Sequence, residues 1–260
     1  MTKVKRALIL PALAALFLTT DTARAFDITA MSDEERAAFR AEVRAYLLDN
    51  PEILLEVIQL LEQRQTQQQQ LDDAALISVN ADEIYNDGHS WVGGNPDGDI
   101  TIVEFSDYRC PYCRKAHPEV ARLLEEDGNI RLIYKEYPIL GDASTTASRF
   151  AVATLLTYPE AYRDVNNALM EMRGEPTAEA LKALAERLGL DAGKIVDRMM
   201  DEDVAAILRK NQELGRRLRI NGTPTFILGD RFLRGYVPLS DMKKLVAETR
   251  AAGKDSGQTD

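Results

Sequence analysis

The chain contains two cysteines, Cys110 and Cys113, which are separated by a proline and a tyrosine. An alternating apolar run at 100–105 precedes them, and a run of helix formers from Ala116 to Leu124 follows. The pattern predicts a strand that leads into a helix, with the cysteines at the helix N-terminus. The unpaired N–H groups and the dipole at that end favour an anion, so we expect Cys110 to be a thiolate at neutral pH. Cys113 lies one turn further along and is expected to be shielded.

Two thiols at this spacing can close into a disulfide, and a thiolate of low pKa can attack the disulfide of another protein. The pair therefore predicts thiol–disulfide exchange. A structural disulfide is a second interpretation, but it would close too short a loop to stabilise much. A zinc site completed by His117 is a third interpretation, and it needs about four ligands. The other histidine, His89, comes before the strand, so such a site would have to recruit carboxylates.

Four features together resemble thioredoxin-fold proteins of the DsbA-like group. They are Glu104 six residues before Cys110, the Cys-Pro-Tyr-Cys site, Pro118 five residues after Cys113, and Gly-Thr-Pro-Thr at 222–225. The resemblance covers roughly residues 76–250. It implies an α/β fold of the thioredoxin type with an inserted all-helical subdomain.

The resemblance also implies roles for individual residues. Cys110 would attack, Cys113 would resolve, and Glu104 would lie buried behind Cys113 and assist its deprotonation. An exposed glutamate on an edge strand is the alternative for Glu104. Thr223 and Pro224 would form a cis-peptide loop that binds the substrate chain beside the sulfurs, whereas a proline next to a strand ordinarily marks an edge or a turn.

Three residues next to the sulfurs, Arg109, Pro111 and Tyr112, are expected to contact the same substrate. Pro111-Tyr112 lacks the histidine of the strongly oxidising Cys-Pro-His-Cys sites, so we expect a disulfide isomerase or reductase, with a dithiol oxidase as the alternative. A protein that binds Cu(I) through both cysteines, as soft ligands, is a candidate of another class. The seven methionines form no Met-x-x-Met cluster, which argues against it. We expect no cofactor.

The first 25 residues have the pattern of a secretory signal peptide, with a basic start, an apolar run at 7–18 and Ala-Arg-Ala at 23–25. The apolar run is shorter than the ~20 residues that a membrane-spanning helix needs. Removal of residues 1–25 takes away four basic residues and one acidic residue, so the formal net charge changes from −10 to −13. An acidic protein is a poor partner for nucleic acid. Export favours the periplasm, where exported proteins with cysteines and a membrane redox partner would be its partners.

Residues 26–70 predict two amphipathic helices followed by a glutamine-rich stalk. A capping box begins at Ser32, and Pro51 begins the second helix, whose apolar stripe includes Leu54, Ile58 and Leu61. This stripe must be covered by the following domain or by another copy of the chain, and we expect another copy. The region resembles the N-terminal part of the suppressor-of-copper-sensitivity C type of DsbA-like protein, which implies homo-oligomerisation.

Residues 71–250 are expected to form the DsbA-like thioredoxin domain, with the helical insertion at about 138–220. The expected elements are a polar helix at 71–87, a turn at 93–98, a strand at 130–137 parallel to the first, helices at 143–156, 160–172, 177–188, 191–200 and 204–218, a hairpin at 225–234 and a closing helix at 238–248. The tail at 251–260 is expected to be mobile.

Overall fold

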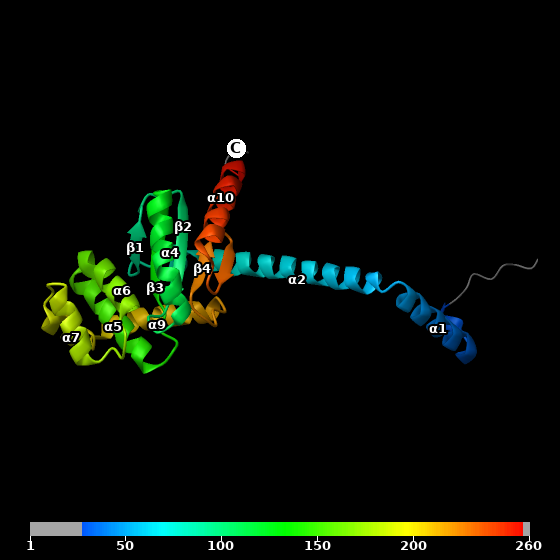
Figure 1. The fold of residues 1–260 in the computed structure, drawn as a ribbon, viewed down its shortest axis with the longest axis horizontal. Coiled ribbons are helices and arrows are strands. Elements are labelled where there is room, and N and C mark those ends of the chain that lie inside the picture. Colours follow the sequence, from blue (N-terminus) through cyan, green and yellow to red (C-terminus); the bar gives the residue numbers. More distant parts are fainter. Residues whose placement is uncertain (1–27, 257–260) are drawn as a thin grey trace, which may run out of the picture. The chain divides into compact units, whose positions relative to one another are not determined.

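The computed structural model describes residues 28–256, so the predicted signal peptide at 1–25 and the end of the tail lie outside the described residues. The chain divides into two compact units, Met1–Leu61 and Glu62–Asp260. Each unit is described by itself. Figure 1 labels the elements along the chain.

The N-terminal unit contains a short 3-10 helix, η1 (Ile28–Ala30), and α1 (Asp33–Asp49), and α2 (Glu52–Val79) begins in it. The predicted capping box is present: the Ser32 hydroxyl accepts from the Glu35 N–H at 3.3 Å, and the Glu35 carboxylate accepts from the Ser32 N–H at 2.8 Å. No residue of α1 is buried. The glutamine-rich stalk is helical, because α2 continues through it without interruption.

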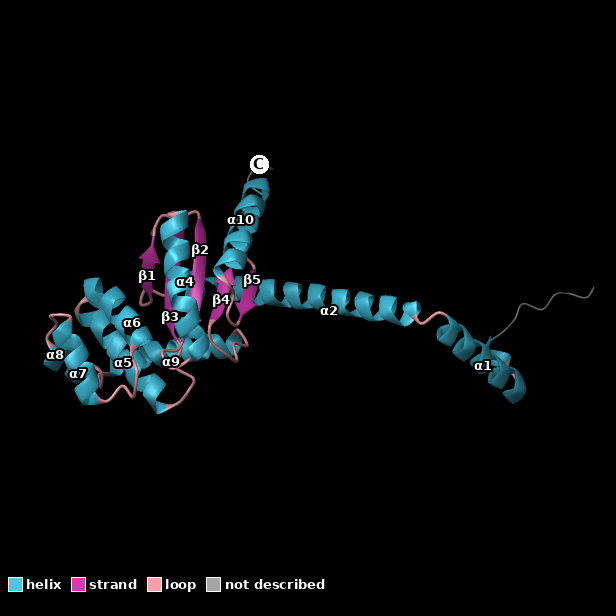
Figure 2. Ribbon diagram, viewed as in Figure 1, coloured by secondary structure: helices cyan, strands magenta, loops and turns pink. Residues whose placement is uncertain are grey.

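The second unit is built on a five-stranded sheet in the order β1-β3-β2-β4-β5 (Figure 2). The strands are β1 (Trp91–Gly94), β2 (Ile100–Ser106), β3 (Ile130–Glu136), β4 (Thr225–Leu228) and β5 (Arg231–Arg234). As predicted, β2 and β3 are parallel, and α4 (Pro111–Asp127) is the crossover between them. The other pairs are antiparallel. The turn expected at 93–98 is wrong at its start, because Gly93 and Gly94 belong to β1.

Each face of the sheet is covered by helices. On one face, Ala116, Val120 and Leu123 of α4 and two residues of α10 (Leu239–Ser256) pack on Ile102 and its neighbours. On the other face, the end of α2, α3 (Ala81–Tyr85) and α9 (Glu202–Arg217) contribute Ile77, Ile84 and Leu214, and the C-cap residue of α9, Leu218, joins them. The prediction of a continuous polar helix at 71–87 is therefore wrong. It is interrupted at Asn80, and Ile77 and Ile84 belong to the core.

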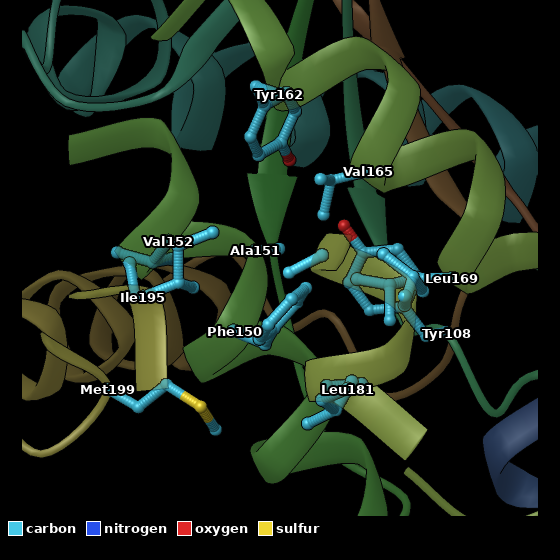
Figure 3. Close-up of a cluster of buried hydrophobic side chains, with 14 of the residues drawn as sticks. Tyr108, Phe150, Ala151, Val152, Tyr162, Val165, Leu169, Leu181, Ile195 and Met199 are labelled. Atoms are coloured by element: carbon cyan, nitrogen blue, oxygen red, sulfur yellow. The ribbon is translucent and has the colours of Figure 1, made fainter. Parts of the chain in front are cut away.

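The block between β3 and β4 is helical, as predicted. It contains α5 (Asp142–Thr157), η2 (Pro159–Ala161), α6 (Tyr162–Glu171), α7 (Ala178–Arg187), α8 (Ala192–Arg198) and α9. These helices surround their own apolar cluster, in which Phe150, Leu181 and Ile195 are fully buried (Figure 3). The closing helix α10 extends to Ser256, past the expected end at 248 and into the expected tail. Within residues 28–256, no helix is both long enough and apolar enough to cross a bilayer.

Candidate active site

The two cysteines lie where β2 passes into α4, as the sequence predicted. Cys110 is the N-cap residue of α4, and Pro111 occupies the first helical position, where a missing N–H costs nothing. Asp107 fixes the connecting loop, because its carboxylate accepts hydrogen bonds from the N–H groups of Arg109, Ile139 and Leu140 at 2.8, 2.8 and 3.1 Å. The sequence analysis did not single out Asp107. Its position three residues before the first cysteine is the only signal it offers.

Both cysteines are free thiols in this structure. Cys113 is fully buried, as expected, and Cys110 is 6% exposed. The Cys110 thiol lies 3.0 Å from the carbonyl oxygen of Thr223, to which it donates. The sulfur of Cys110 is therefore less exposed than its place at a helix N-terminus suggested. Its exposed neighbours are Pro111 and Tyr112, and Tyr112 is 61% exposed.

The pKa values of the two thiols are shifted in opposite directions from their ordinary value. A hydrogen bond from Cys113, supported by the backbone N–H groups of Cys113 and Tyr112, lowers the pKa of Cys110 to about 5. Burial raises the pKa of Cys113 far above its ordinary value, and the neighbouring Cys110 and Glu104 raise it further. Cys110 can therefore be a thiolate at neutral pH while Cys113 keeps its proton. This is the division between an attacking and a resolving thiol.

Glu104 lies on β2, between β3 and β4, and it is 1% exposed. The alternative of an exposed edge-strand glutamate is therefore wrong. Burial raises the pKa of Glu104 to about 7, and the charge of Glu136 adds to this effect. Its Oε1 atom has no hydrogen-bond partner among residues 28–256. A carboxyl group with a pKa near neutrality can both accept and return a proton at physiological pH.

A cavity of about 570 Å³ between α4 and α6 reaches this carboxyl group. Glu104 and Tyr134 form part of its wall, together with His117 and Asn167. The Nε2 atom of His117 lies 2.8 Å from Oδ1 of Asn167, and burial lowers the pKa of His117. The imidazole is thus engaged with Asn167 of α6, and the described residues contain no group of three or more His, Cys, Asp or Glu side chains that could hold a metal ion.

The peptide bond between Thr223 and Pro224 is cis, as the resemblance implied. Pro224 is buried, and its carbonyl oxygen accepts a hydrogen bond from the N–H of Gly235 at 2.9 Å. The Thr223 carbonyl faces Cys110. The loop and the sulfur of Cys110 are therefore in contact, although 113 residues separate them in the sequence.

The side chain of Arg109, which was expected to contact the substrate, is bonded to the loop after α6. Its guanidinium donates to the carbonyl oxygen of Gly174 at 2.6 Å and to the carboxylate of Glu175 at 2.8 Å. These bonds join the start of the active-site helix to the loop after α6. Arg109 therefore holds the insertion against the redox site, whereas Tyr112 is free to meet another molecule.

The structure adds a group of buried polar residues that sequence reasoning missed. Glu136, at the end of β3, accepts hydrogen bonds from the hydroxyls of Tyr108 and Tyr162, each at 2.6 Å. Asn166 donates to the Tyr108 hydroxyl at 3.0 Å. Glu136 lies at the end of a strand that also contains Arg131 and Lys135, so the sequence did not mark it in the way that an otherwise uncharged strand marked Glu104.

Two family profiles match the chain. A profile described as Thioredoxin matches residues 85–248, and a profile described as the N-terminal domain of the copper resistance protein ScsC matches residues 35–68. Among curated proteins, the chain matches Na⁺/H⁺ antiporters NhaA from two Salinispora species, at 29% and 26% identity over 65% and 63% of this chain. The chain spans about a quarter of the length of these relatives, 26% and 25%.

Solved structures give similar results. A thioredoxin-like oxidoreductase from Silicibacter pomeroyi is 38% identical, with a TM-score of 0.62, and the match covers 65% of this chain and 97% of that one. The thiol–disulfide exchange protein α-DsbA2 from Wolbachia pipientis is 28% identical, with a TM-score of 0.65, over 69% of this chain and 97% of that one. ScsC from Proteus mirabilis, in a transitional conformation, is 28% identical, with a TM-score of 0.63, over 86% of this chain and 99% of that one.

These matches agree with the fold expected from the sequence, a thioredoxin fold with an inserted helical subdomain that follows an N-terminal helical region. The chain belongs to the thioredoxin family, in its DsbA-like group and of the ScsC type.

Proposed function

We propose that the chain is a periplasmic thiol–disulfide oxidoreductase that acts on exported proteins with cysteines. The observation that carries the proposal is the pair of thiols with opposite acidities, Cys110 with a pKa of about 5 and Cys113 with a strongly raised pKa, at one helix N-terminus. Cys110 attacks the client disulfide, and Cys113 resolves the mixed disulfide. Glu104 takes the proton that Cys113 releases.

The client chain binds across the site as an extended segment. Thr223 and Pro224 lie beside Cys110, and the exposed side chains of Pro111 and Tyr112 border the same sulfur. Main-chain groups of such a loop recognise a client without regard to its side chains. This mode of binding suits an enzyme that must accept many exported proteins.

The trapping experiment uses two single variants of the full chain. Reduced Cys113→Ala, incubated with a protein whose disulfides are scrambled, should accumulate a covalent adduct that dithiothreitol releases, because no second thiol resolves it. Cys110→Ala should give no adduct. A Cys113→Ala protein that forms no adduct would refute the proposal, and it is the result expected of a chain that only carries Cu(I).

The direction of the reaction is proposed to be isomerisation or reduction, with the site kept reduced by a membrane redox partner. A refolding assay on a scrambled-disulfide protein, run beside a dithiol oxidation assay, separates this direction from that of a dithiol oxidase. Rapid dithiol oxidation without recovery of the scrambled protein would reverse the assignment.

Self-association through residues 26–70 supports isomerisation in this proposal. Leu54, Ile58 and Leu61 of α2 are exposed, and a groove between α1 and the start of α2 has apolar walls that include Phe39 and Leu47. The match to the ScsC N-terminal domain spans the same residues. Several active sites in one oligomer raise the local concentration of attacking thiols around one client.

Light scattering tests the assembly. Ile58→Asp in the full chain places a charge on the apolar stripe and should lower the molecular mass toward that of a monomer and reduce isomerase activity, while simple dithiol exchange is retained. Gln67→Asp adds the same charge to the glutamine-rich part of α2 and should leave the mass unchanged. A wild-type protein that is already monomeric and fully active as an isomerase would contradict this part of the proposal.

A further inference from the structure

Glu104 and Glu136 lie on the same face of two neighbouring strands. In the parallel pairing of β2 with β3, Glu104 is opposite Tyr134, and Ser106 is opposite Glu136. Because side chains two residues apart share one face, the two glutamates are diagonal neighbours, a separation that long side chains can bridge. Glu104 is 1% exposed and Glu136 is 3% exposed. Two acidic side chains are thus buried together behind the redox pair.

The two acids differ in their hydrogen bonds. Glu136 Oε1 accepts from the hydroxyls of Tyr108 and Tyr162, which point toward each other in Figure 3. Donors of this kind stabilise the ionised carboxylate. By contrast, Oε1 of Glu104 has no partner among the described residues, nor has Oε2 of Glu136 or the hydroxyl of Tyr134. Burial raises the pKa of Glu136 to about 7 although the two tyrosines lower it, and the pKa of Glu104 is also about 7. The two acids therefore ionise in the same pH range, and a negative charge on Glu136, which the tyrosine pair stabilises, raises the pKa of Glu104.

The titratable and charged groups around the pair come from every element packed against it. They are Tyr134 on β3, Asp107 and Tyr108 in the loop before α4, Cys113 and His117 on α4, and Tyr162 and Arg163 on α6. Tyr108 occupies the second position before Cys110, and Arg114 of α4 donates to its carbonyl oxygen at 2.7 Å. Glu136 is therefore bonded to the same loop that carries the attacking cysteine.

We propose that Glu136 is a second acid of the redox site and that its negative charge makes Glu104 the stronger base toward Cys113. The inference rests on the proposed exchange function. When Cys113 attacks the mixed disulfide, its proton passes to the Glu104 carboxylate, and the transfer relieves the repulsion between the two glutamates. The Cys110–Cys113 bond forms and the bond from Cys110 to the client sulfur breaks. The client sulfur leaves as a thiolate and takes a proton from solvent, so that two electrons pass from the enzyme thiols to the client disulfide.

The test measures resolution of a mixed disulfide between Cys110 and glutathione in a single turnover, as a function of pH. The wild-type rate should rise with a midpoint near the Glu104 pKa of about 7. In Glu136→Gln the amide oxygen still accepts from both tyrosines, but the charge is gone. The midpoint should fall by about one pH unit, and the plateau rate should fall by about threefold because the base is weaker. Glu136→Asp should restore the wild-type midpoint in part.

Three further variants complete the test. In Glu104→Gln the rate of resolution should show no midpoint near a pH of about 7. Glu186→Gln removes a charge from the exposed face of α7 and should have the wild-type midpoint and rate. Tyr162→Phe keeps Glu136 but removes one donor, so its midpoint should also fall, by less. If Glu136→Gln does not fold, the midpoint of Tyr162→Phe decides the test.

Wild-type midpoints in both Glu136→Gln and Tyr162→Phe would overturn the inference and leave Glu136 a structural residue. A wild-type protein that forms no mixed disulfide, or never resolves one, would instead refute the proposed function.

Discussion

The acidity of Cys110 depends above all on its hydrogen bond from Cys113, which is the largest cause of its low pKa. Cys113→Ala removes this donor and leaves the backbone N–H groups of the helix N-terminus in place. Cys113→Ser is the matched control, because a hydroxyl keeps a donor at the same position. We therefore predict that the pKa of Cys110 rises in the alanine variant and rises less in the serine variant.

The size of the shift follows from the contact that is lost. A hydrogen bond to a charged group contributes about 1.5–3 kcal/mol, and one pKa unit corresponds to about 1.4 kcal/mol. The alanine variant should therefore move the Cys110 pKa from about 5 upward by roughly one to two units. At a pH of about 5, where half of the wild-type thiol is ionised, the thiolate fraction should fall roughly 5- to 50-fold.

The assay is alkylation of Cys110 by iodoacetamide as a function of pH, since only the thiolate reacts. Cys113 does not interfere in the wild type, because it is buried and its pKa is strongly raised. An alanine variant with the wild-type midpoint would refute the assignment of the low pKa to Cys113. A serine variant that shifts as far as the alanine variant would refute the role of the hydrogen bond.

Three further predictions concern stability, measured by urea unfolding. The pKa of Glu104 in the folded protein, about 7, lies above the unfolded value of ~4.3. The contribution of Glu104 to stability is therefore fully present below a pH of ~4.3 and is lost as the pH rises through about 7. Glu104→Gln should accordingly be more stable than the reduced wild type at a pH of about 8, by about 1–3 kcal/mol. Phe150→Ala should lose about 3–5 kcal/mol, because it leaves a cavity in the core of the insertion. Asp73→Asn should lose about 1–2 kcal/mol through its paired bonds to Arg234, at 2.8 and 2.9 Å. Equal stability of any one variant and the wild type, at the stated pH, would contradict the corresponding reasoning.

The elements nearest the cysteines were predictable because their signals are local. Alternation at 100–105 and the proline after Cys110 fix the strand and the start of the helix, and the observed β2 and α4 follow them. The five helices between β3 and β4 were also recognised within a few residues, since amphipathic spacing is a property of short segments.

The strand β1 was missed because its glycines suggested a turn. Gly94 has a φ of +67°, and a Cβ atom there would lie 2.3 Å from the carbonyl oxygen of Ile130. A Cβ atom on Gly93 would meet the ring of Trp91. Gly94 permits close approach to β3 and Gly93 leaves room for the Trp91 ring, and neither need is visible before the fold is assembled.

Long-range contacts explain the other omissions. Ile77 and Ile84 are isolated apolar residues in a polar stretch, and only the sheet that covers them shows that they are core. The tyrosines that bind Glu136 come from positions 108 and 162, so no local pattern joins them to 136. Burial of the carboxylate, which decides its chemistry, is equally a property of the assembled fold.

The contact between Cys110 and Thr223 changes with ionisation of the thiol. The thiol donates to the Thr223 carbonyl at 3.0 Å, but a group with a pKa of about 5 has no proton to donate at neutral pH. A thiolate and a carbonyl oxygen at this distance repel each other, so the bond to the Thr223 carbonyl is lost on ionisation, whereas a side-chain hydrogen bond from Thr223 lowers the pKa of Cys110 and stabilises the thiolate. In the proposed function, the thiolate state that attacks a client disulfide is therefore also the state in which the Thr223 carbonyl can accept a hydrogen bond from the client's backbone. The proposed function thus connects the acidity of Cys110 with client binding through one residue, Thr223, whose carbonyl and side chain both contact the sulfur.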